Sequence, residues 1–527
     1  MRLSHSRTLL VSLFLTCLST SSGEGQAMDR TMVPRGQLRL QAHPVFTSWD
    51  RRFGGAEGSS GAIEELGQDL TAGNTAELFP GFEDLRAAVR DLTGIADYVP
   101  TLGPTSSRVQ QEMTSIDFGA EVGLFEWLTV GIQVPWTQTR TVVDVLHSPS
   151  AADLGLNPTL SNPASVTSFL ASASDVGAAA RAHADAVCAS DPGLTCTNAL
   201  DLAARTAAFE AGLASAYGAT PFFPLAGATG GQALSEALSA LNSELLAANL
   251  STFQPLILAS ETLTQEGLAL LPAINGSGIG AAMPLQTRQG LWGVGDIAAS
   301  VRLRLLDNLT AAEGAAAPVL GYRVTTRFSV RFPTGTPEDP DVLLDIGTGD
   351  AQLDLEGGFS ADIRLAGRIG LAAAGFYTHQ RATTVTRRVA APGELMAPAT
   401  TRREVYWLPG AVWGAEAAPY LRLSSTVSLH AEYRFVHKRS DEIELAVPDP
   451  TLDPLVLQLG SGLTLHQVGG GLRYDGVGSW LGGDHQRPME VHMRFLHAIA
   501  GGGGQAPKWT RVEAGLRLFR RLWGGAR

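Results

Sequence analysis

The sequence predicts an all-β membrane protein: an up-and-down antiparallel transmembrane β-barrel of about twelve strands, with a large, mostly helical extracellular insertion. Three observations predict this fold. The chain begins with a segment typical of a secretion signal, a period-two alternation of apolar and polar residues recurs along it, and long connections alternate with short ones.

The secretion signal occupies the first 27 residues. Arg2 and Arg7 provide the positive start, 9–18 is a short apolar core, and 25–27 offers the small residues that a signal peptidase reads. No later segment has the roughly 18 uninterrupted apolar residues that a spanning helix needs. We therefore expect residues 1–27 to be a cleavable signal peptide and the mature chain to lie in the outer membrane of a Gram-negative cell.

The clearest alternation runs from Ile116 to Trp136, interrupted by a short turn at 125–127. On both sides of the turn, apolar residues alternate with polar residues and glycines, as expected for a β-hairpin with one apolar face. The pattern recurs further along the chain. Predicted strands lie near 36–49, 108–124, 128–143, 297–305, 322–332, 351–363, 367–381, 403–423, 426–438, 463–475, 488–499 and 508–519.

Between these strands the chain divides into segments of different character. Helical periodicity is found at 83–93, 198–217 and 231–249, the last with leucines at 234, 238, 241 and 245. The expected divisions are a signal peptide at 1–27, three barrel strands in 28–143 with a long loop at 50–107, a helical insertion at 144–289, the remaining strands at 290–519 and a C-terminal tail at 520–527.

The connections between predicted strands separate by length. If the N-terminus is periplasmic, the connections that fall on the periplasmic side are mostly short, and those on the outer side include 50–107, 144–289 and 382–402. Outer-membrane barrels have short periplasmic turns and longer extracellular loops. A soluble β-sandwich has no reason to divide its loops in this way.

The cysteines predict a disulfide, and the net charge limits the kinds of molecule that the chain could bind. Signal cleavage removes Cys17 and leaves Cys188 and Cys196, so we expect a local disulfide in the oxidising compartment outside the inner membrane. The net charge of −12 argues against nucleic acid as a partner. The expected partners are outer-membrane lipid, a small-molecule solute and the barrel-assembly machinery. That machinery usually recognises a final strand whose last residue is aromatic. Here the last predicted strand ends at Phe519, and eight residues follow it.

Several short motifs carry a resemblance to a known family. They are 128–135 (LTVGIQVP), 293–297 (GVGDI), 332–335 (FPTG), 347–349 (GTG) and 431–435 (AEYRF). In this order they resemble the Gram-negative outer-membrane transporters of the meta-pathway of phenol degradation. The resemblance covers roughly 108–143 and 290–519 and excludes the insertion. It implies a barrel that passes small, often aromatic, compounds, and it brings no catalytic residues.

The sequence thus favours a non-enzymatic channel or transporter for passive uptake of small hydrophobic or aromatic molecules, without a cofactor. The alternative is a surface binding or adhesion protein that uses the barrel as an anchor for 144–289. We expect the insertion to lie mainly at the outer mouth, with at least one segment narrowing the bore, because about twelve strands leave an intermediate lumen.

Charged residues on the polar strand faces are the candidate lumen lining. A basic strip on two neighbouring strands precedes an acidic strip on the next, and the two could form a charged constriction or interior ion pairs that brace the wall. The candidates are Arg302, Arg304, Arg323, Arg327, Arg331, Asp354, Glu356, Asp362, Glu432, Arg434, Glu490, His492 and Arg494.

Two strands place acid, base and histidine on one face, at His430 to Arg434 and at Glu490 to Arg494. An acid–base or metal site is conceivable there. Spacing by two is also what any polar strand face produces, and the plain strand face is the favoured interpretation. We expect no metal site.

Overall fold

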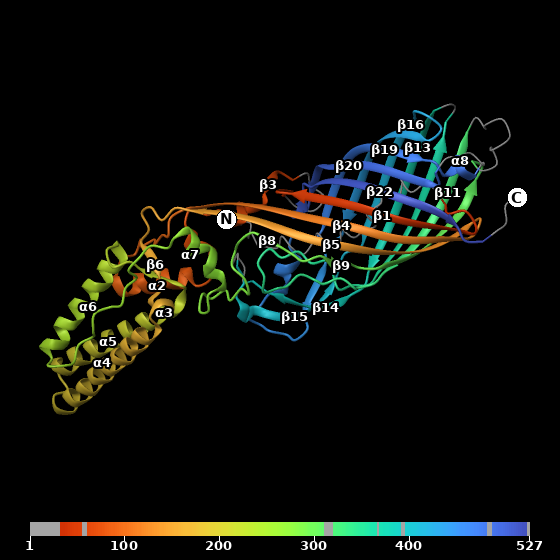
Figure 1. The fold of residues 1–527 in the computed structure, drawn as a ribbon. Helices are drawn as coiled ribbons and strands as arrows, with labels where there is room; N and C mark the ends of the chain where they lie inside the picture. The colour runs from red at the N-terminus through yellow and green to blue at the C-terminus, as the bar shows by residue number, and fades with distance from the viewer. Residues whose placement is uncertain are drawn as a thin grey trace.

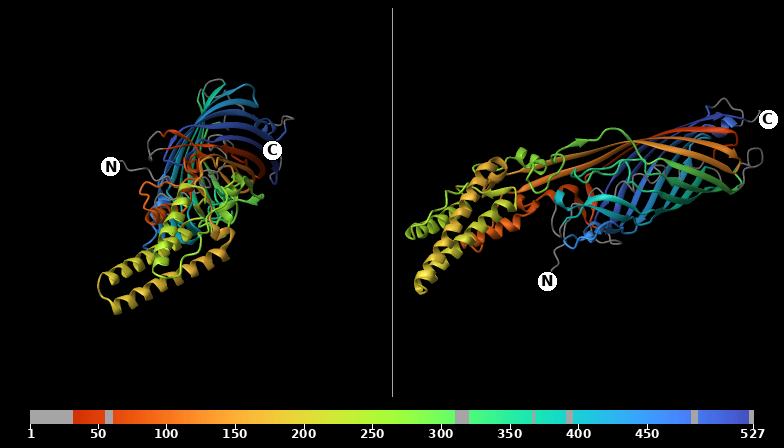
Figure 2. Two further views of the ribbon diagram at one scale, coloured as in Figure 1. Left: turned by 90° about the vertical axis from the view of Figure 1, so that its left-hand side faces the viewer. Right: turned by 90° about the horizontal axis from the view of Figure 1, so that it is seen from below.

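The computed structural model describes residues 32–54, 61–309, 320–365, 368–390, 396–481 and 487–523. The expected signal peptide lies outside the described residues. The molecule is elongated, with a β-barrel at one end and a helical projection at the other (Figures 1 and 2).

The barrel is a closed antiparallel sheet of 12 strands, as the sequence predicts. Each barrel strand pairs with the next along the chain, and β22 pairs with β1 to complete the ring. The strands are β1 (Gln37–Trp49), β4 (Thr105–Phe125), β5 (Leu128–His147), β10 (Ala298–Asp307), β11 (Gly321–Arg331), β12 (Asp354–Arg364), β13 (Ile369–Gln380), β16 (Val412–Arg422), β17 (Val427–Lys438), β19 (Leu463–Asp475), β20 (Met489–Gly502) and β22 (Thr510–Arg521).

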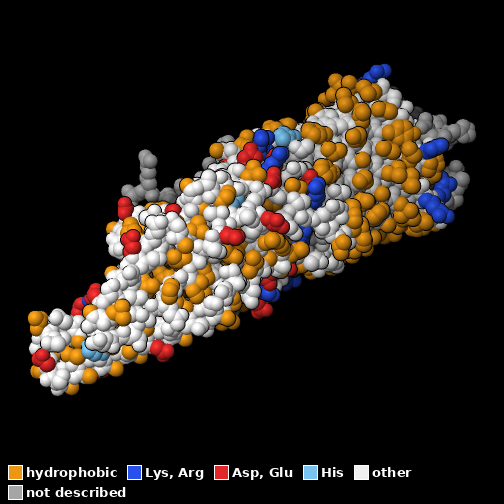
Figure 3. All heavy atoms as spheres, turned by 60° about the vertical axis from the view of Figure 1, so that its left-hand side comes forward, with side chains coloured by type: hydrophobic (Ala, Val, Ile, Leu, Met, Phe, Trp, Pro, Cys, Tyr) orange, Lys and Arg blue, Asp and Glu red, His pale blue; other side chains and the backbone are white. Residues whose placement is uncertain are grey.

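The outer face of the barrel is apolar and the inner face is polar. In β20, Val491, Met493 and Phe495 are exposed, while the alternating residues Glu490, His492 and Arg494 are buried. Figure 3 shows hydrophobic side chains covering the part of the barrel that is distant from the projection. Because every strand pairs on both sides, such a sheet can face lipid without leaving backbone groups unpaired.

The two ends of the barrel differ in their connections. Two residues join β4 to β5 and four join β16 to β17 at the short-turn end, whereas β1–β4, β5–β10 and β13–β16 are joined by long segments at the opposite, long-loop end. The expected separation of connections by length is therefore present.

One of the predicted strands corresponds to two separate strands in the structure. Residues 403–423 divide at Pro409 and Gly410 into β15 (Arg402–Leu408) and β16. Proline cannot donate to a sheet, and a side chain at Gly410 would meet the backbone of Arg439. Strand β15 instead joins a separate sheet at the long-loop end, with β14 (Thr383–Arg388) and β18 (Glu442–Leu445).

Short elements complete the long-loop end. Strands β2, β3 and β21 form one small sheet, and β6 and β7 form another at the root of the projection. Their bounds, with the short helices, are β2 (Arg51–Phe53), β3 (Ile63–Glu65), β21 (Ala506–Pro507), β6 (Leu154–Leu156), β7 (Phe222–Pro224), η1 (Leu66–Leu70), η2 (Thr75–Leu78), η3 (Leu271–Ala273), η4 (Ala399–Thr401), η5 (Pro454–Gln458) and, at the short-turn end, α8 (Val477–Leu481).

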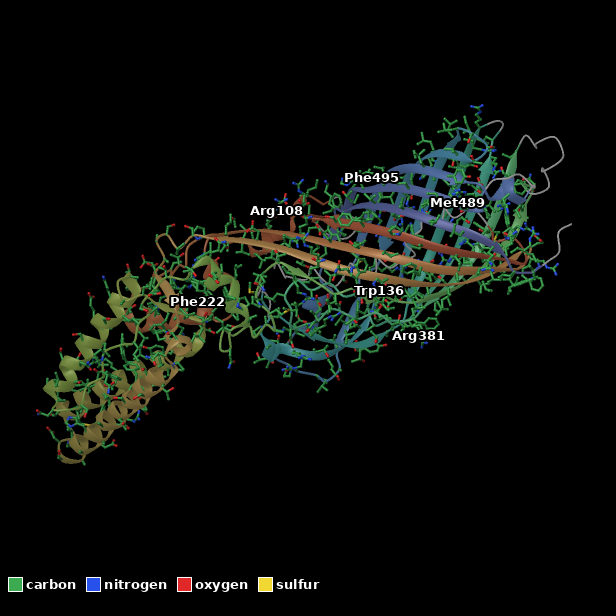
Figure 4. The ribbon with its side chains drawn as sticks, in the orientation of Figure 1. Arg108, Trp136, Phe222, Arg381, Met489 and Phe495 are labelled. Carbon is green, nitrogen blue, oxygen red and sulfur yellow. A yellow bond between two sulfur atoms is a disulfide. The ribbon has the colours of Figure 1, made fainter. Side chains whose placement is uncertain are left out.

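The hairpin β4–β5 is much longer than the other barrel strands and leaves the barrel. Strand β10 pairs with β5 only as far as Gln133. Beyond it, β5 is accompanied by the two-residue strands β9 (Gly293–Val294) and β8 (Arg288–Gln289). The 14 residues of β5 that follow Gln133 extend about 45 Å at the usual strand rise. In Figure 4 the hairpin leads from Trp136 past Arg108 to the helices around Phe222.

The projection contains α2 (Phe82–Thr93), α3 (Pro158–Ser161), α4 (Pro163–Ser190), α5 (Leu194–Ala219), α6 (Thr229–Ala247) and α7 (Gln265–Leu270). None of the helices in the described residues is long and apolar enough to cross a membrane. The predicted helices correspond to α2, α5 and α6, and the leucine stripe of α6 is buried. Helix α2 comes from the β1–β4 connection, so two outer loops share one core.

Helix α4 is absent from the prediction. Its buried positions are mostly small, including Ala173, Gly177, Ala180 and Ala184. Alanine and glycine give little hydrophobic contrast between the faces of a helix, so the periodic signal is weak. At the root of the projection, the buried Asn157 side chain donates to the carbonyl groups of Tyr217 and Thr220 and so fixes the helices to the end of the hairpin.

The helices of the insertion lie away from the barrel mouth (Figure 1). Residues near 280 contact the mouth loops, where Arg388 donates to the carbonyl groups of Ile279 and Gly280. The segment that lies on the inner face of β5 comes from the β11–β12 connection instead: Thr139 and Thr141 donate to the carbonyl groups of Ile346 and Leu344.

The predicted disulfide is present. Cys188 at the end of α4 and Cys196 at the start of α5 are bonded, with their Cα atoms 4.6 Å apart. The bridge closes the tip of the α4–α5 hairpin, at the far end of the molecule from the barrel (Figure 1).

Reduction of this bridge should therefore loosen the tip and leave the barrel intact. Closing so short a loop stabilises the hairpin by about 2–3 kcal/mol in the chain-entropy model, and no barrel strand depends on it. Heat-modifiability on a gel should be the same with and without reductant, while protease cleavage between α4 and α5 increases. Loss of the compact barrel band on reduction alone would contradict this.

The barrel interior as candidate functional site

The predicted lumen residues all lie on the inner face of the barrel, and none of the 13 is exposed. The period-two pattern explains this, because successive side chains of a strand point to opposite faces. The structure brings these residues together in two groups: one beneath β16–β22 and β1, and one along β10–β12.

The first group is a dense cluster of charges. Arg494 on β20 is 3.2 Å from Glu432 on β17 and 2.5 Å from Glu513 on β22. Glu513 is also 3.5 Å from Nε2 of His43, which in turn lies 3.3 Å from Nε2 of His492. We call these five residues the interior cluster.

The Arg494–Glu432 pair crosses over β19, which lies between their strands. Inward-facing glycines of β19 permit this. A side chain at Gly469 would meet the carbonyl of Phe495, and one at Gly471 would meet the carbonyl of Met493 and the ring of His430. Between β20 and β22, a side chain at Gly515 would meet the ring of His492. Glycine at these positions leaves room for large side chains from neighbouring strands.

Further ion pairs surround the interior cluster. Arg434 is 3.2 Å from Glu416, and Glu490 is 3.2 Å from both Arg473 and Arg517. The side chains of these residues are at most 6% exposed. This half of the interior is closely packed, with acids and bases in alternation. It corresponds to the alternative of interior ion pairs that brace the barrel wall.

The second group, along β10–β12, is more open. The register places Arg331 opposite Asp354 and Arg323 opposite Asp362. The first two form an ion pair, whereas Arg323 lies 2.9 Å from Asp307 and Asp362 accepts a hydrogen bond from Tyr420. Glu356 accepts one from Thr378 on β13.

Two arginines of this wall face each other, because Arg302 and Arg327 are directly paired in the β10–β11 register. Like charges opposite each other are unfavourable. Among the described residues, no carboxylate lies within ion-pair distance of Arg327.

The wall along β10–β12 is more exposed than the wall of the interior cluster. The side chains of Arg304 and Arg323 are 21% and 15% exposed, compared with 1% for Arg494 and Glu513. The exposure is confined to part of this wall, because Arg302 and Arg331 on the same strands are buried.

The prediction missed several partners of this network. The same period-two reasoning applied to 36–49 and 508–519 would have found Arg39, His43, Glu513 and Arg517, which lie on the inward positions of their strands. Arg39 is 2.5 Å from Glu121 on the neighbouring strand β4. Which acid meets which base was not predictable, because several pairs join strands that are not adjacent.

A loop at the long-loop end is held to the wall by a buried carboxylate. Asp296, between β9 and β10, accepts hydrogen bonds from the backbone N–H groups of Gly335 at 2.8 Å and Asp350 at 3.4 Å. The pKa of Asp296 is raised to about 6, mainly by burial and also by the charge of Asp350, while Arg331 opposes the change. Within the described residues, no group of three His, Cys, Asp or Glu side chains could hold a metal ion.

Removing one charge from the interior cluster should destabilise the barrel strongly. Glu513→Gln leaves Arg494 and His43 with less compensating charge, and breaking a buried ion pair costs about 3–5 kcal/mol. The matched control is Glu356→Gln, on the more accessible wall. The urea midpoint for unfolding in detergent should fall well below that of the native protein for the first variant and little for the second. Equal midpoints would show that the cluster is not bracing the wall.

Asp296 should make the stability of the loop at 335–350 dependent on pH. The folded state raises this pKa from 3.8 to about 6, so it binds the proton more tightly than the unfolded chain does. The stabilisation is complete below about pH 4 and is lost as the pH rises through 6. Asp296→Asn should remove this dependence.

The measurement is the thermal midpoint of both proteins at pH 4.5 and pH 8. Between pH 4.5 and pH 8, the thermal midpoint of the variant should rise relative to that of the native protein. A constant difference between the two proteins would show that Asp296 does not titrate in this range.

Comparisons with known proteins found similarity only among solved structures. No family model and no curated protein matches the chain. Among solved structures, similarity is found to the COG4313 outer membrane channel from Pseudomonas putida F1, at 8% identity and a TM-score of 0.42, over 94% of this chain and 100% of that one.

Two further similar structures have lower TM-scores. The toluene transporter TbuX of Ralstonia pickettii is 8% identical, with a TM-score of 0.26 over 97% of this chain and 99% of that one. The translocator domain of the autotransporter NalP from Neisseria meningitidis is 7% identical, with a TM-score of 0.27 over 94% and 90%. The structures found thus include an outer membrane channel and a toluene transporter.

Proposed function

We propose that this protein is an outer-membrane channel for passive uptake of small molecules, and that it is not an enzyme. The observation that carries the proposal is the division of the barrel interior. One wall is packed with the interior cluster and its neighbours, while on the wall of β10–β12 Arg304, Arg323 and Arg327 remain partly exposed. The 13 residues predicted from the sequence would line this lumen.

In this proposal the short-turn end faces the periplasm and the long-loop end faces outward, in the outer membrane of a Gram-negative cell. The apolar outer face contacts lipid, and barrel-assembly machinery inserts the closed sheet. The expected signal peptide would direct the export of the chain. The arrangement follows the usual one for such barrels, in which the extracellular loops are the longer ones.

Small hydrophobic or aromatic molecules are the proposed solutes. Near the long-loop end, inward positions that are charged elsewhere hold apolar side chains: Phe376, Val412, Val436, Leu465 and Leu496. These side chains are buried, so they make this part of the interior apolar without forming an open surface. The partly exposed arginines favour a small aromatic solute with a polar or anionic substituent, because arginine binds both aromatic faces and carboxylates.

A second candidate function is binding at the cell surface by the projection. The hairpin β4–β5 carries the helices well beyond the barrel mouth (Figure 2). An insertion that served only to close the bore would not need this extension.

Planar-bilayer recordings of the purified protein test the channel. We expect single-channel conductance with a preference for anions from the arginine wall. Arg327→Ser should reduce this preference, seen as a shift of reversal potential in a salt gradient, because Arg327 has no carboxylate partner among the described residues. Arg108→Ser, an exposed change on the hairpin beyond the barrel, should have no effect. A folded barrel that passes neither ions nor small solutes into liposomes would refute the channel.

A further inference from the structure

A groove runs along the projection between α2, α5 and α6. Its volume is about 950 Å³, at the upper end of the range for ligand sites. The floor is apolar, with Phe209 and Leu241 at 7% and 6% exposure. Helices α5 and α6 are joined across the distal part of the groove by an ion pair of 2.5 Å between Arg205 and Glu244.

The walls of the groove consist of small residues at helical spacing. On α5 the groove residues Ala208, Gly212, Ser215 and Ala219 recur at intervals of four, three and four, and Ala240 faces them from α6. This spacing places them in one row along the helix. Leu92 of α2 already covers Gly212. The exposed small residues Ala208, Ser215 and Ala240 leave room for the backbone of another helix to approach closely. The shape of the groove therefore fits a helix better than an extended strand.

The charge around the groove is negative. Residues 144–289 contain eleven acidic and three basic residues, and α2 adds three acidic residues and the two arginines Arg86 and Arg90. Of the basic ones, Arg205 is paired with Glu244 and Asp201, and Arg288 with Asp345. Asp84 and Asp91 line the groove from α2 and are exposed; among the described residues, neither has a cation within ion-pair distance.

The negative charge around the groove indicates which kind of molecule could bind there. A second copy of the chain would bring two acidic projections together, and an anionic lipid headgroup or nucleic acid would be repelled. A cationic partner would be attracted over a distance and held at the rim by Asp84 and Asp91.

We propose that the groove binds a cationic amphipathic helix presented by another molecule at the cell surface. Its apolar face lies on Phe209 and Leu241, and its basic side chains reach the carboxylates of α2. The proposal rests on the second proposed function, surface binding by the projection, and is independent of passage through the barrel.

The test uses the full-length protein in detergent micelles and a fluorescent peptide of about 18 residues, five helical turns. One face of the peptide is leucine and alanine, and the other is lysine. Fluorescence anisotropy gives its affinity for the native protein. A peptide with glutamate in place of lysine is the charge control.

Filling the groove should abolish binding. Ala208→Leu combined with Ala240→Leu changes two exposed residues, so the fold should tolerate it, and the affinity should fall at least about tenfold because the added side chains occupy the space of the peptide. The matched control is Ala182→Leu, an exposed alanine on α4 outside the groove. Heat-modifiability and helical circular dichroism confirm that the variants are folded.

The carboxylates are tested in the same way. Asp84→Asn with Asp91→Asn should weaken binding several-fold at low salt and little at high salt, since exposed charges are screened. Asp175→Asn on α4 is the control.

The remaining outcomes overturn one proposal or the other. If the native and filled-groove proteins bind the peptide equally, the groove is not its binding site. The second proposed function, surface binding by the projection, would then still stand. No binding of the cationic peptide by the native protein refutes the assigned occupant. Self-association in sedimentation, lost on filling the groove, would make a second copy the occupant and refute the charge argument.

Discussion

Closure of the sheet between β22 and β1 is the constraint on which the rest of the structure depends. In lipid, an unpaired strand edge costs several kcal/mol for each backbone group, so the first and last strands must meet. Their ten aligned residue pairs, from Gln37 with Arg521 to Ser48 with Thr510, complete the ring. Once the ring closes, the period-two alternation fixes which side chains face lipid and which face inward. The charged interior is a consequence of closure.

A closed ring of this size then has to accommodate its inward charges. Burying an ion pair costs desolvation that only good geometry repays, and the barrel supplies that geometry unevenly. Beneath β17–β22, inward glycines such as Gly471 and Gly515 leave space for histidine and arginine side chains, and each acid meets a base. Along β10–β12 the acids and bases are less closely packed: Arg304, Arg323 and Arg327 are partly exposed, while Arg302 and Arg331 are buried. We expect the packed wall to contribute more to the stability of the barrel and the partly exposed wall to contact a solute.

The features predicted from the sequence are those set by local patterns. The twelve strands, the disulfide and the inward set from Arg302 to Arg494 all follow from alternation and spacing. The features missed have different causes. Proline and glycine at 409–410 are a local signal that the continuous alternation around them obscured, and the alanine-rich α4 shows too little contrast between its faces for a periodic signal. The pairing of Arg494 with Glu432 requires two strands that are not neighbours, so no local pattern contains it.

The hairpin β4–β5 makes the barrel wall and the projection mechanically continuous. Its lower part is part of the ring, paired with β1 and β10, and its upper part ends in the helices, where Asn157 fixes the root. The loop at 335–350 also rests on β5, through Thr139 and Thr141, and on Asp296. A partner that seats on α2, α5 and α6 therefore contacts elements rigidly attached to the strand that carries this loop. Because β5 and β10 pair over only six residues, this seam has fewer hydrogen bonds than its neighbours. It is the place in the ring where force applied through the hairpin would act first.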